Sequence, residues 1–285
     1  MKSFLPILAI LLGIISSQAH RYAFLIKYLL MLMLFFPFLK TKITTFYLHT
    51  IWIVVANIAI AFSVYFVILP FNSELALLCF ITAITPTATA APAVIAFLKG
   101  NVEYVASSVL LTNSVVGLMI PLFLSWLTTP ETSISTSEVF QSIGFVFGIP
   151  LLIAQLVKEV NSSLHKFLLK QNFLSFYIWN ILLFLAVARA AHFIIYESST
   201  TPQRIFLIAA SSLMLCILNF GIGKWIGGRQ FALESSQALG QKNTMFTVWL
   251  AFSFLNPIMA LGPMFYLLYH NLYNSYQLIK VKNAI

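Results

Sequence analysis

Long apolar runs separated by short polar segments make up most of the chain. A helix that spans a bilayer needs about 20 apolar residues, and a broken or re-entrant helix needs fewer. This criterion predicts about ten membrane helices, with approximate bounds at 4–17, 22–39, 48–69, 75–98, 102–127, 139–157, 173–193, 205–223, 231–254 and 257–279. The longest polar stretch, 128–138, is too short for a soluble domain, so residues 1–285 are expected to form a single all-α transmembrane domain.

Two of these runs are interrupted near their midpoints by residues that do not continue a helix. The first interruption, at 85–92, contains Pro86 and Pro92, and the second, at 234–244, is a polar stretch around Gly240. Lipid offers no hydrogen bonds, so backbone that leaves a helix inside the bilayer must be satisfied by protein or by a water-filled cavity. The two interruptions therefore mark a site.

The interruptions occupy corresponding places in the two halves of the chain. With a first repeat at about 1–128 and a second at about 137–282, each break falls in the fourth helix of its half. An odd number of helices per repeat inverts the second repeat, and paired broken helices in inverted repeats indicate the binding site of a secondary transporter. The predicted architecture is therefore two inverted five-helix repeats whose broken helices four and nine cross.

Composition narrows the class of protein. The chain is 60% hydrophobic and 8% charged, with a mean hydropathy of +0.95, whereas soluble domains carry about 25% charged residues. All seven acidic residues are glutamates, which argues against membrane enzymes that use paired aspartates. Cys79 and Cys216 lie in apolar runs, and no nucleophile–base motif or metal-ligand spacing occurs. We expect a multi-pass membrane protein that is not an enzyme and has no cofactor.

The net charge of +9 is spread along the chain as single basic residues, which favours membrane orientation over nucleic-acid binding. With the N-terminus inside, the outer side receives only Arg21 and Arg204. The cytoplasmic side receives the other basic residues that flank the spans, namely Lys2, Lys40, Lys42, Lys99, Lys158, Lys166, Lys170, Lys224, Arg229, Lys280 and Lys282. Both termini are therefore predicted to be cytoplasmic in a cell-membrane protein. The first segment also fits a cleaved signal peptide, although Pro6 and Gly13 favour a membrane helix.

Several short motifs carry a resemblance to a known family. They are TAAPAVIAFLKGNV at 89–102, QKNT at 241–244, Asn256-Pro257 and Tyr269-His270-Asn271. In this order and spacing the chain resembles the bile acid:sodium symporter family. The resemblance implies a panel domain of helices one, two, six and seven, and a core domain of helices three to five and eight to ten. It also implies sodium-coupled transport of an organic anion, with both bound where helices four and nine cross.

The family's functional positions transfer unevenly to this chain. The resemblance places Thr89, Asn243, His270 and Asn271 among the substrate contacts. The family's sodium ligands fall instead on residues without a side-chain oxygen, which are Ala91, Pro92, Val105, Val109 and Ala238. Sodium coupling is therefore in question, and any bound Na⁺ would need backbone carbonyls together with Glu234, Gln241, Thr112 or Asn113, because hard cations want several oxygen ligands.

Lys242 stands where the family has a glutamine beside the asparagine. A lysine at bilayer depth costs roughly 2.5–3.5 kcal/mol on insertion scales, so its ammonium should face a cavity or a partner. In one interpretation it is a surrogate for a cation or titrates during transport. Alternatively it snorkels to water from a break near one face.

The other polar candidates also have ordinary roles. Glu234 either presents its carboxylate near the second break or lies at the membrane interface where a helix starts. Thr112 and Asn113 fit either cation ligands or an interhelical hydrogen bond. The rival functions are a membrane enzyme acting at bilayer depth and a non-transporting, receptor-like homologue.

Overall fold

The structure, a computed structural model, describes residues 5–40, 46–127 and 135–283, without the side chains of Asn172, Lys282 and Asn283. The described residues are almost entirely helical and contain no β-strand beyond residues of an isolated β-bridge. Within the described part of the chain, five helical segments are long and apolar enough to cross a membrane: Leu48–Ile68, Val102–Leu127, Thr136–Val160, Leu174–Glu197 and Pro202–Gly227. The chain is an all-α membrane protein.

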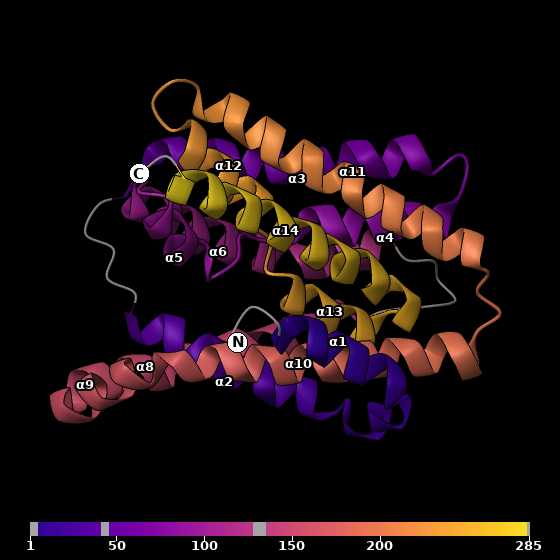
Figure 1. The fold of residues 1–285 in the computed structure, drawn as a ribbon, viewed down its shortest axis with the longest axis horizontal. Helices are drawn as coiled ribbons and strands as arrows, with labels where there is room; N and C mark the ends of the chain where they lie inside the picture. Colours follow the sequence, from indigo (N-terminus) through magenta and orange to yellow (C-terminus); the bar gives the residue numbers. More distant parts are fainter. Residues whose placement is uncertain (1–4, 41–45, 128–134, 284–285) are drawn as a thin grey trace. The chain divides into compact units, whose positions relative to one another are not determined.

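The chain divides into two compact units. The first unit comprises 1–42, 134–200 and 249–258. Its helices are α1 (Leu5–Ile15), α2 (Leu25–Lys40), α7 (Thr136–Ile143), α8 (Ile149–Val160), α9 (Ser162–Lys170) and α10 (Leu174–His192). Within this unit α1 packs along α10, and α2 packs against α8 and α10 (Figure 1). These are the first, second, sixth and seventh spans of the sequence analysis, with α9 added. The unit also contains residues 249–254 of α13 (Thr244–Phe254), which come from the ninth span.

The second unit comprises 43–133, 201–248 and 259–285. Its helices are α3 (Ile51–Ile68), α4 (Ser73–Ile84), α5 (Ala91–Phe97), α6 (Val102–Leu127), α11 (Pro202–Gly227), α12 (Ala232–Gly240) and α14 (Leu261–Asn283). The first residues of α13 (Thr244–Phe254) also belong to it. In this unit α3 packs on α4, and α12 turns back against α11 (Figure 1).

Glycine and helix caps set these packings locally. A Cβ at Gly223 of α11 would lie 2.5 Å from the carbonyl oxygen of Ser235 on α12, so only glycine permits this close approach. Asn72 begins α4 by accepting a hydrogen bond from the Leu75 amide through Oδ1 at 2.8 Å. Thr201 caps α11, and Pro202 follows in the first turn, where its missing N–H has no helical partner to lose.

Both predicted helix breaks are present. The α4 helix ends at Ile84, two residues before Pro86, and α5 begins at Ala91 with Pro92 in its first turn. The α12 helix ends at Gly240, and α13 begins at Thr244. Proline lacks an amide hydrogen and clashes with the preceding turn, which explains the first break.

The region between α8 and α10 differs from the sequence expectation. The sequence assigns 158–170 to a cytoplasmic loop, whereas the structure forms α9 there, capped by Asn161, whose Oδ1 accepts from the Leu164 amide at 2.8 Å. The α9 helix has only nine residues, too few for the span criterion. The segments 41–45 and 128–134, which carry much of the predicted inner and outer loops, lie outside the described residues. The orientation of the chain stays a prediction.

Candidate functional site

The two helix breaks of the second unit pair with each other through their backbones. Thr87 and Lys242 form an antiparallel β-bridge. On one side of the bridge the Ala88 amide donates to the Gln241 carbonyl at 2.8 Å, and on the other the Asn243 amide donates to the Pro86 carbonyl at 2.8 Å. This pairing, which we call the crossing, satisfies backbone groups that the breaks release from their helices.

Each break also caps the helix end that precedes the other break. From the second break, Lys242 donates through Nζ to the Ala83 carbonyl of α4 at 3.0 Å. From the first break, Thr87 donates through Oγ1 to the Ala238 carbonyl of α12 at 2.6 Å. The last carbonyls of a helix have no partner within it, so these side chains supply partners and lock the two helix ends together.

Lys242 lies deep within the unit. Its side chain is 2% exposed, and Nζ donates to Asn57 Oδ1 on α3 as well as to the Ala83 carbonyl. The Asn57 amide in turn donates to the Ile84 carbonyl at 2.8 Å. A lysine that snorkels reaches water at its tip, whereas this one ends at neutral oxygens near the negative end of the α4 dipole.

Amide groups beside Lys242 lack hydrogen-bond partners. Gln241 and Asn243 are each 4% exposed, yet Gln241 Oε1 and Asn243 Nδ2 have no partner among the described residues, and neither has Asn113 Oδ1. A buried polar atom without a partner costs roughly 1–3 kcal/mol, so native proteins seldom leave several of them together. The crossing therefore offers two acceptors and one donor to a ligand or to water.

Thr112 and Asn113 of α6 support the first break. The Thr87 amide donates to Thr112 Oγ1 at 3.1 Å, and Asn113 Nδ2 donates to the Thr87 carbonyl at 2.9 Å. Of the two roles considered from sequence, these contacts are the interhelical hydrogen bonds. They hold both polar groups of the Thr87 peptide in place.

Glu234 joins α12 to the start of α6, away from the crossing. It is 9% exposed, and its Oε1 accepts from the Asn101 amide at 2.8 Å. A helix rises about 1.5 Å per residue, so the six residues from Glu234 to Gly240 cover roughly 9 Å. Glu234 is therefore a buried helix-start residue, and its carboxylate does not reach Lys242.

The remaining predicted substrate contacts lie at different distances from the crossing. Thr89 is half-buried in the turn that follows Thr87. His270 is 4% exposed, stacks edge-on against Tyr266, and has no partner for Nδ1 among the described residues. Tyr266 donates to the Gly240 carbonyl at 2.7 Å, so His270 is one contact away from the second break. Asn271 donates to the Leu267 carbonyl within α14.

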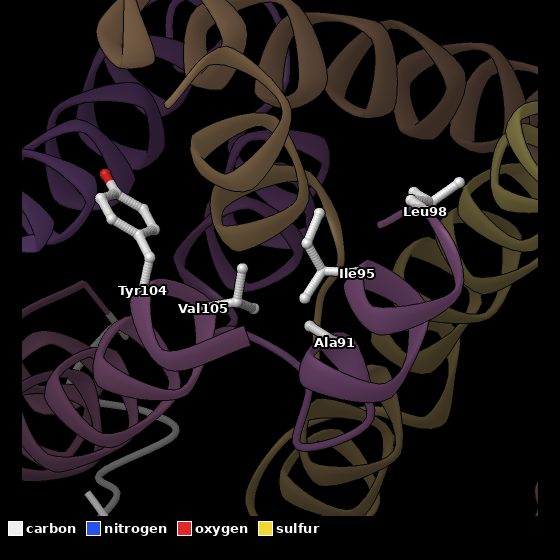
Figure 2. Close-up of a cluster of buried hydrophobic side chains, with 5 residues drawn as sticks. All are labelled: Ala91, Ile95, Leu98, Tyr104 and Val105. Atoms are coloured by element: carbon white, nitrogen blue, oxygen red, sulfur yellow. The ribbon is translucent and has the colours of Figure 1, made fainter. Parts of the chain in front are cut away.

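Two positions where the resemblance places sodium ligands lie in a hydrocarbon cluster. Ala91 of α5 and Val105 of α6 are fully buried, together with Ile95, Leu98 and Tyr104. Figure 2 shows Ala91, Ile95 and Val105 directed toward the space between α5 and α6, while the Tyr104 ring extends away from it. Ala91 and Val105 therefore offer no side-chain oxygen to a hard cation. Among the described residues, no group of three or more His, Cys, Asp or Glu side chains could hold a metal ion.

Several residues of the crossing were not selected from sequence. Asn57 is an amide in the middle of an apolar run, and such a residue is costly in a membrane helix unless it has a partner. The sequence therefore already indicated that Asn57 has a polar partner. Thr85 pairs with Thr247 through their hydroxyls at 2.7 Å, and Thr87 bonds α6 and α12. For Thr85 and Thr87, the sequence signal is the alternation of threonines at 85–89.

No family model matches the chain, and no curated protein matches it. The resemblance to the symporter family therefore rests on the motif residues alone.

Proposed function

We propose that the chain is a secondary active transporter of an organic anion, and that the crossing is its binding site. One observation carries the proposal: two broken helices pair at a buried Lys242 whose partners are neutral and whose neighbours have unpartnered amides. Irregular backbone at membrane depth is tolerated where it forms a site, and broken helices are the usual place for such a site in transporters.

The organisation of the chain supports this proposal. In our interpretation the ten apolar spans form two inverted five-helix repeats in a cell-membrane protein with cytoplasmic termini. Apart from residues 249–258, which fall in the first unit, the two compact units contain the same spans as the panel and core domains that the resemblance to the bile acid:sodium symporter family implies. Substrate would cross when the core moves relative to the panel, carrying the crossing from one side of the membrane to the other.

The chemistry of the crossing favours an anion. Lys242 supplies a positive charge, Asn243 Nδ2 is a donor without a partner, and α13 begins at Thr244 with its positive dipole end toward the break. Carboxylate, sulfonate and sulfate groups accept such donors. Sodium has less to bind, because the positions that match the family's ligands lack side-chain oxygens, so we expect little sodium dependence.

A thermal-shift screen of the purified protein tests this function. Organic carboxylates, sulfonates and sulfate esters are compared with their neutral amide or alcohol analogues, with and without sodium. A ligand that binds the native state raises the apparent stability by RT ln(1 + [L]/Kd). Anions that stabilise the protein should also accumulate in proteoliposomes. The proposal fails if no anion is taken up, and binding without uptake would favour the receptor-like alternative.

A further inference from the structure

The charge on Lys242 has no counter-charge among the described residues of the second unit. No acidic side chain among the described residues forms an ion pair with it, and its acceptors, Asn57 Oδ1 and the Ala83 carbonyl, are both neutral. An ammonium has three N–H donors, so these two acceptors leave one unaccounted for. Buried charges in proteins are normally paired, because an isolated charge loses its hydration without compensation.

The charged groups of the surrounding helices lie too far away to provide compensation. The described acidic residues of this unit, Glu74, Glu103 and Glu234, all sit in the first turns of α4, α6 and α12. Glu74 pairs with Arg204, and Glu234 bonds the Asn101 amide. At about 1.5 Å per residue, the helix between Glu74 and Ala83 is roughly 13 Å long.

The titratable groups closer to Lys242 provide no negative charge. Cys216 of α11 is a buried thiol within electrostatic range. Tyr266 of α14 donates its hydroxyl to the Gly240 carbonyl, and His270 follows it by one turn. The described lysines and arginines on α11 and α14 lie near helix ends, at Arg204, Lys224 and Lys280.

We propose that Lys242 is neutral in the empty site and takes up one proton when the anion binds. The proton from water forms the third N–H bond on the lone pair of Nζ, and it returns to water when the anion leaves on the other side. This inference rests on the proposed function for its anion, and it makes transport of a monovalent anion electroneutral. By reciprocity, protonation raises the affinity for the anion by the same factor as the anion raises the affinity for the proton.

The protonation state of the empty site is tested without any substrate. The Tm of the unmodified protein is compared with that of Lys242→Met, an apolar side chain of similar length, over a pH range well below the ordinary lysine value of about 10.4. A lysine that is neutral when folded and charged when unfolded binds fewer protons in the native state, so stability rises with pH. The unmodified protein should therefore gain Tm relative to Lys242→Met as the pH rises. A difference that stays constant with pH overturns the proposal.

A second variant guards against a Lys242→Met protein that does not fold. Asn57→Asp places a carboxylate beside Nζ at nearly unchanged shape, so Lys242 should remain charged in the empty site. As the pH rises, the Tm of the unmodified protein should then also increase relative to that of Asn57→Asp. Equal pH dependence in the two proteins contradicts a neutral Lys242.

Transport by proteoliposomes tests the coupling itself. An aryl sulfonate serves as the probe, because it stays ionised over the whole pH range. An inward proton gradient should drive its uptake at any clamped membrane potential, and its affinity should fall about tenfold per pH unit on the alkaline side. Uptake that follows a sodium gradient and ignores the proton gradient overturns this inference while leaving the transporter assignment intact. Absence of uptake for every anion removes the transporter assignment, and the Tm comparison still decides whether Lys242 is neutral.

Discussion

Replacing Lys242 by glutamine should turn the position of Nζ into a sodium site. The substitution frees Asn57 Oδ1 and the Ala83 carbonyl, which now bind Nζ. It also brings an amide oxygen of its own. Three neutral oxygens in a buried place suit a hard monovalent cation. We expect Lys242→Gln to bind sodium weakly and the unmodified protein to bind none there.

The expected size follows from ligand linkage. With a Kd about one tenth of the sodium concentration, RT ln(1 + [Na⁺]/Kd) is about 1.4 kcal/mol. At roughly 2–4 °C per kcal/mol, sodium should raise the Tm of Lys242→Gln by roughly 3–6 °C. The assay is a thermal melt in sodium chloride against choline chloride of equal ionic strength, with the unmodified protein alongside.

Two results would refute this reasoning. If sodium stabilises the unmodified protein as much as Lys242→Gln, the ammonium does not occupy a cation position. If strictly sodium-dependent uptake survives Lys242→Gln with its rate unchanged, Lys242 takes no part in coupling.

Three further predictions concern the supports of the crossing and the orientation of the chain. Asn113→Leu leaves the Thr87 carbonyl without its donor and should lower stability by about 1–3 kcal/mol in a thermal melt, whereas Ser114→Leu at the next, exposed position should change it little. Glu234→Leu leaves the Asn101 amide without an acceptor and should lower the free energy of unfolding by a similar amount, whereas Glu234→Gln keeps an acceptor and should lower it less. Equal losses of stability would contradict the assigned contact. A membrane-impermeant thiol reagent outside intact cells should label Ser133→Cys and not Ser163→Cys.

The helices and their breaks were predictable because they depend on residues that are close together in the sequence. The predicted span at 102–127 coincides with α6, and Pro86, Pro92 and Gly240 lie at the breaks that the structure contains. Apolar length and proline act within one helix, so one sequence carries their signal. The α9 helix was missed because its apolar face is only nine residues long and is interleaved with lysines, which the span criterion counts as loop.

Contacts between distant residues were not predictable in the same way. The sequence left two roles open for Glu234, but its partner, the Asn101 amide, is 133 positions away, and no local pattern indicates that contact. The same holds for Lys242 and Asn57, which are 185 positions apart. Each residue alone signalled a polar group at depth that needs a partner, and only the folded chain identifies the partner.

Because of the reciprocal capping at the crossing, we expect single substitutions of Lys242 or Thr87 to disturb both helix ends. Lys242 closes the end of α4, and Thr87 closes the end of α12, while the Thr87–Lys242 bridge joins the two breaks. Loss of the Thr87 hydroxyl therefore frees the Ala238 carbonyl, and loss of the Lys242 side chain frees the Ala83 carbonyl and Asn57 Oδ1. A site built in this way couples the positions of both helix ends to the state of one side chain. A change in the charge of Lys242 acts directly on α4 through Ala83 and on α3 through Asn57, which is the arrangement needed for an occupied and an empty site to differ in structure.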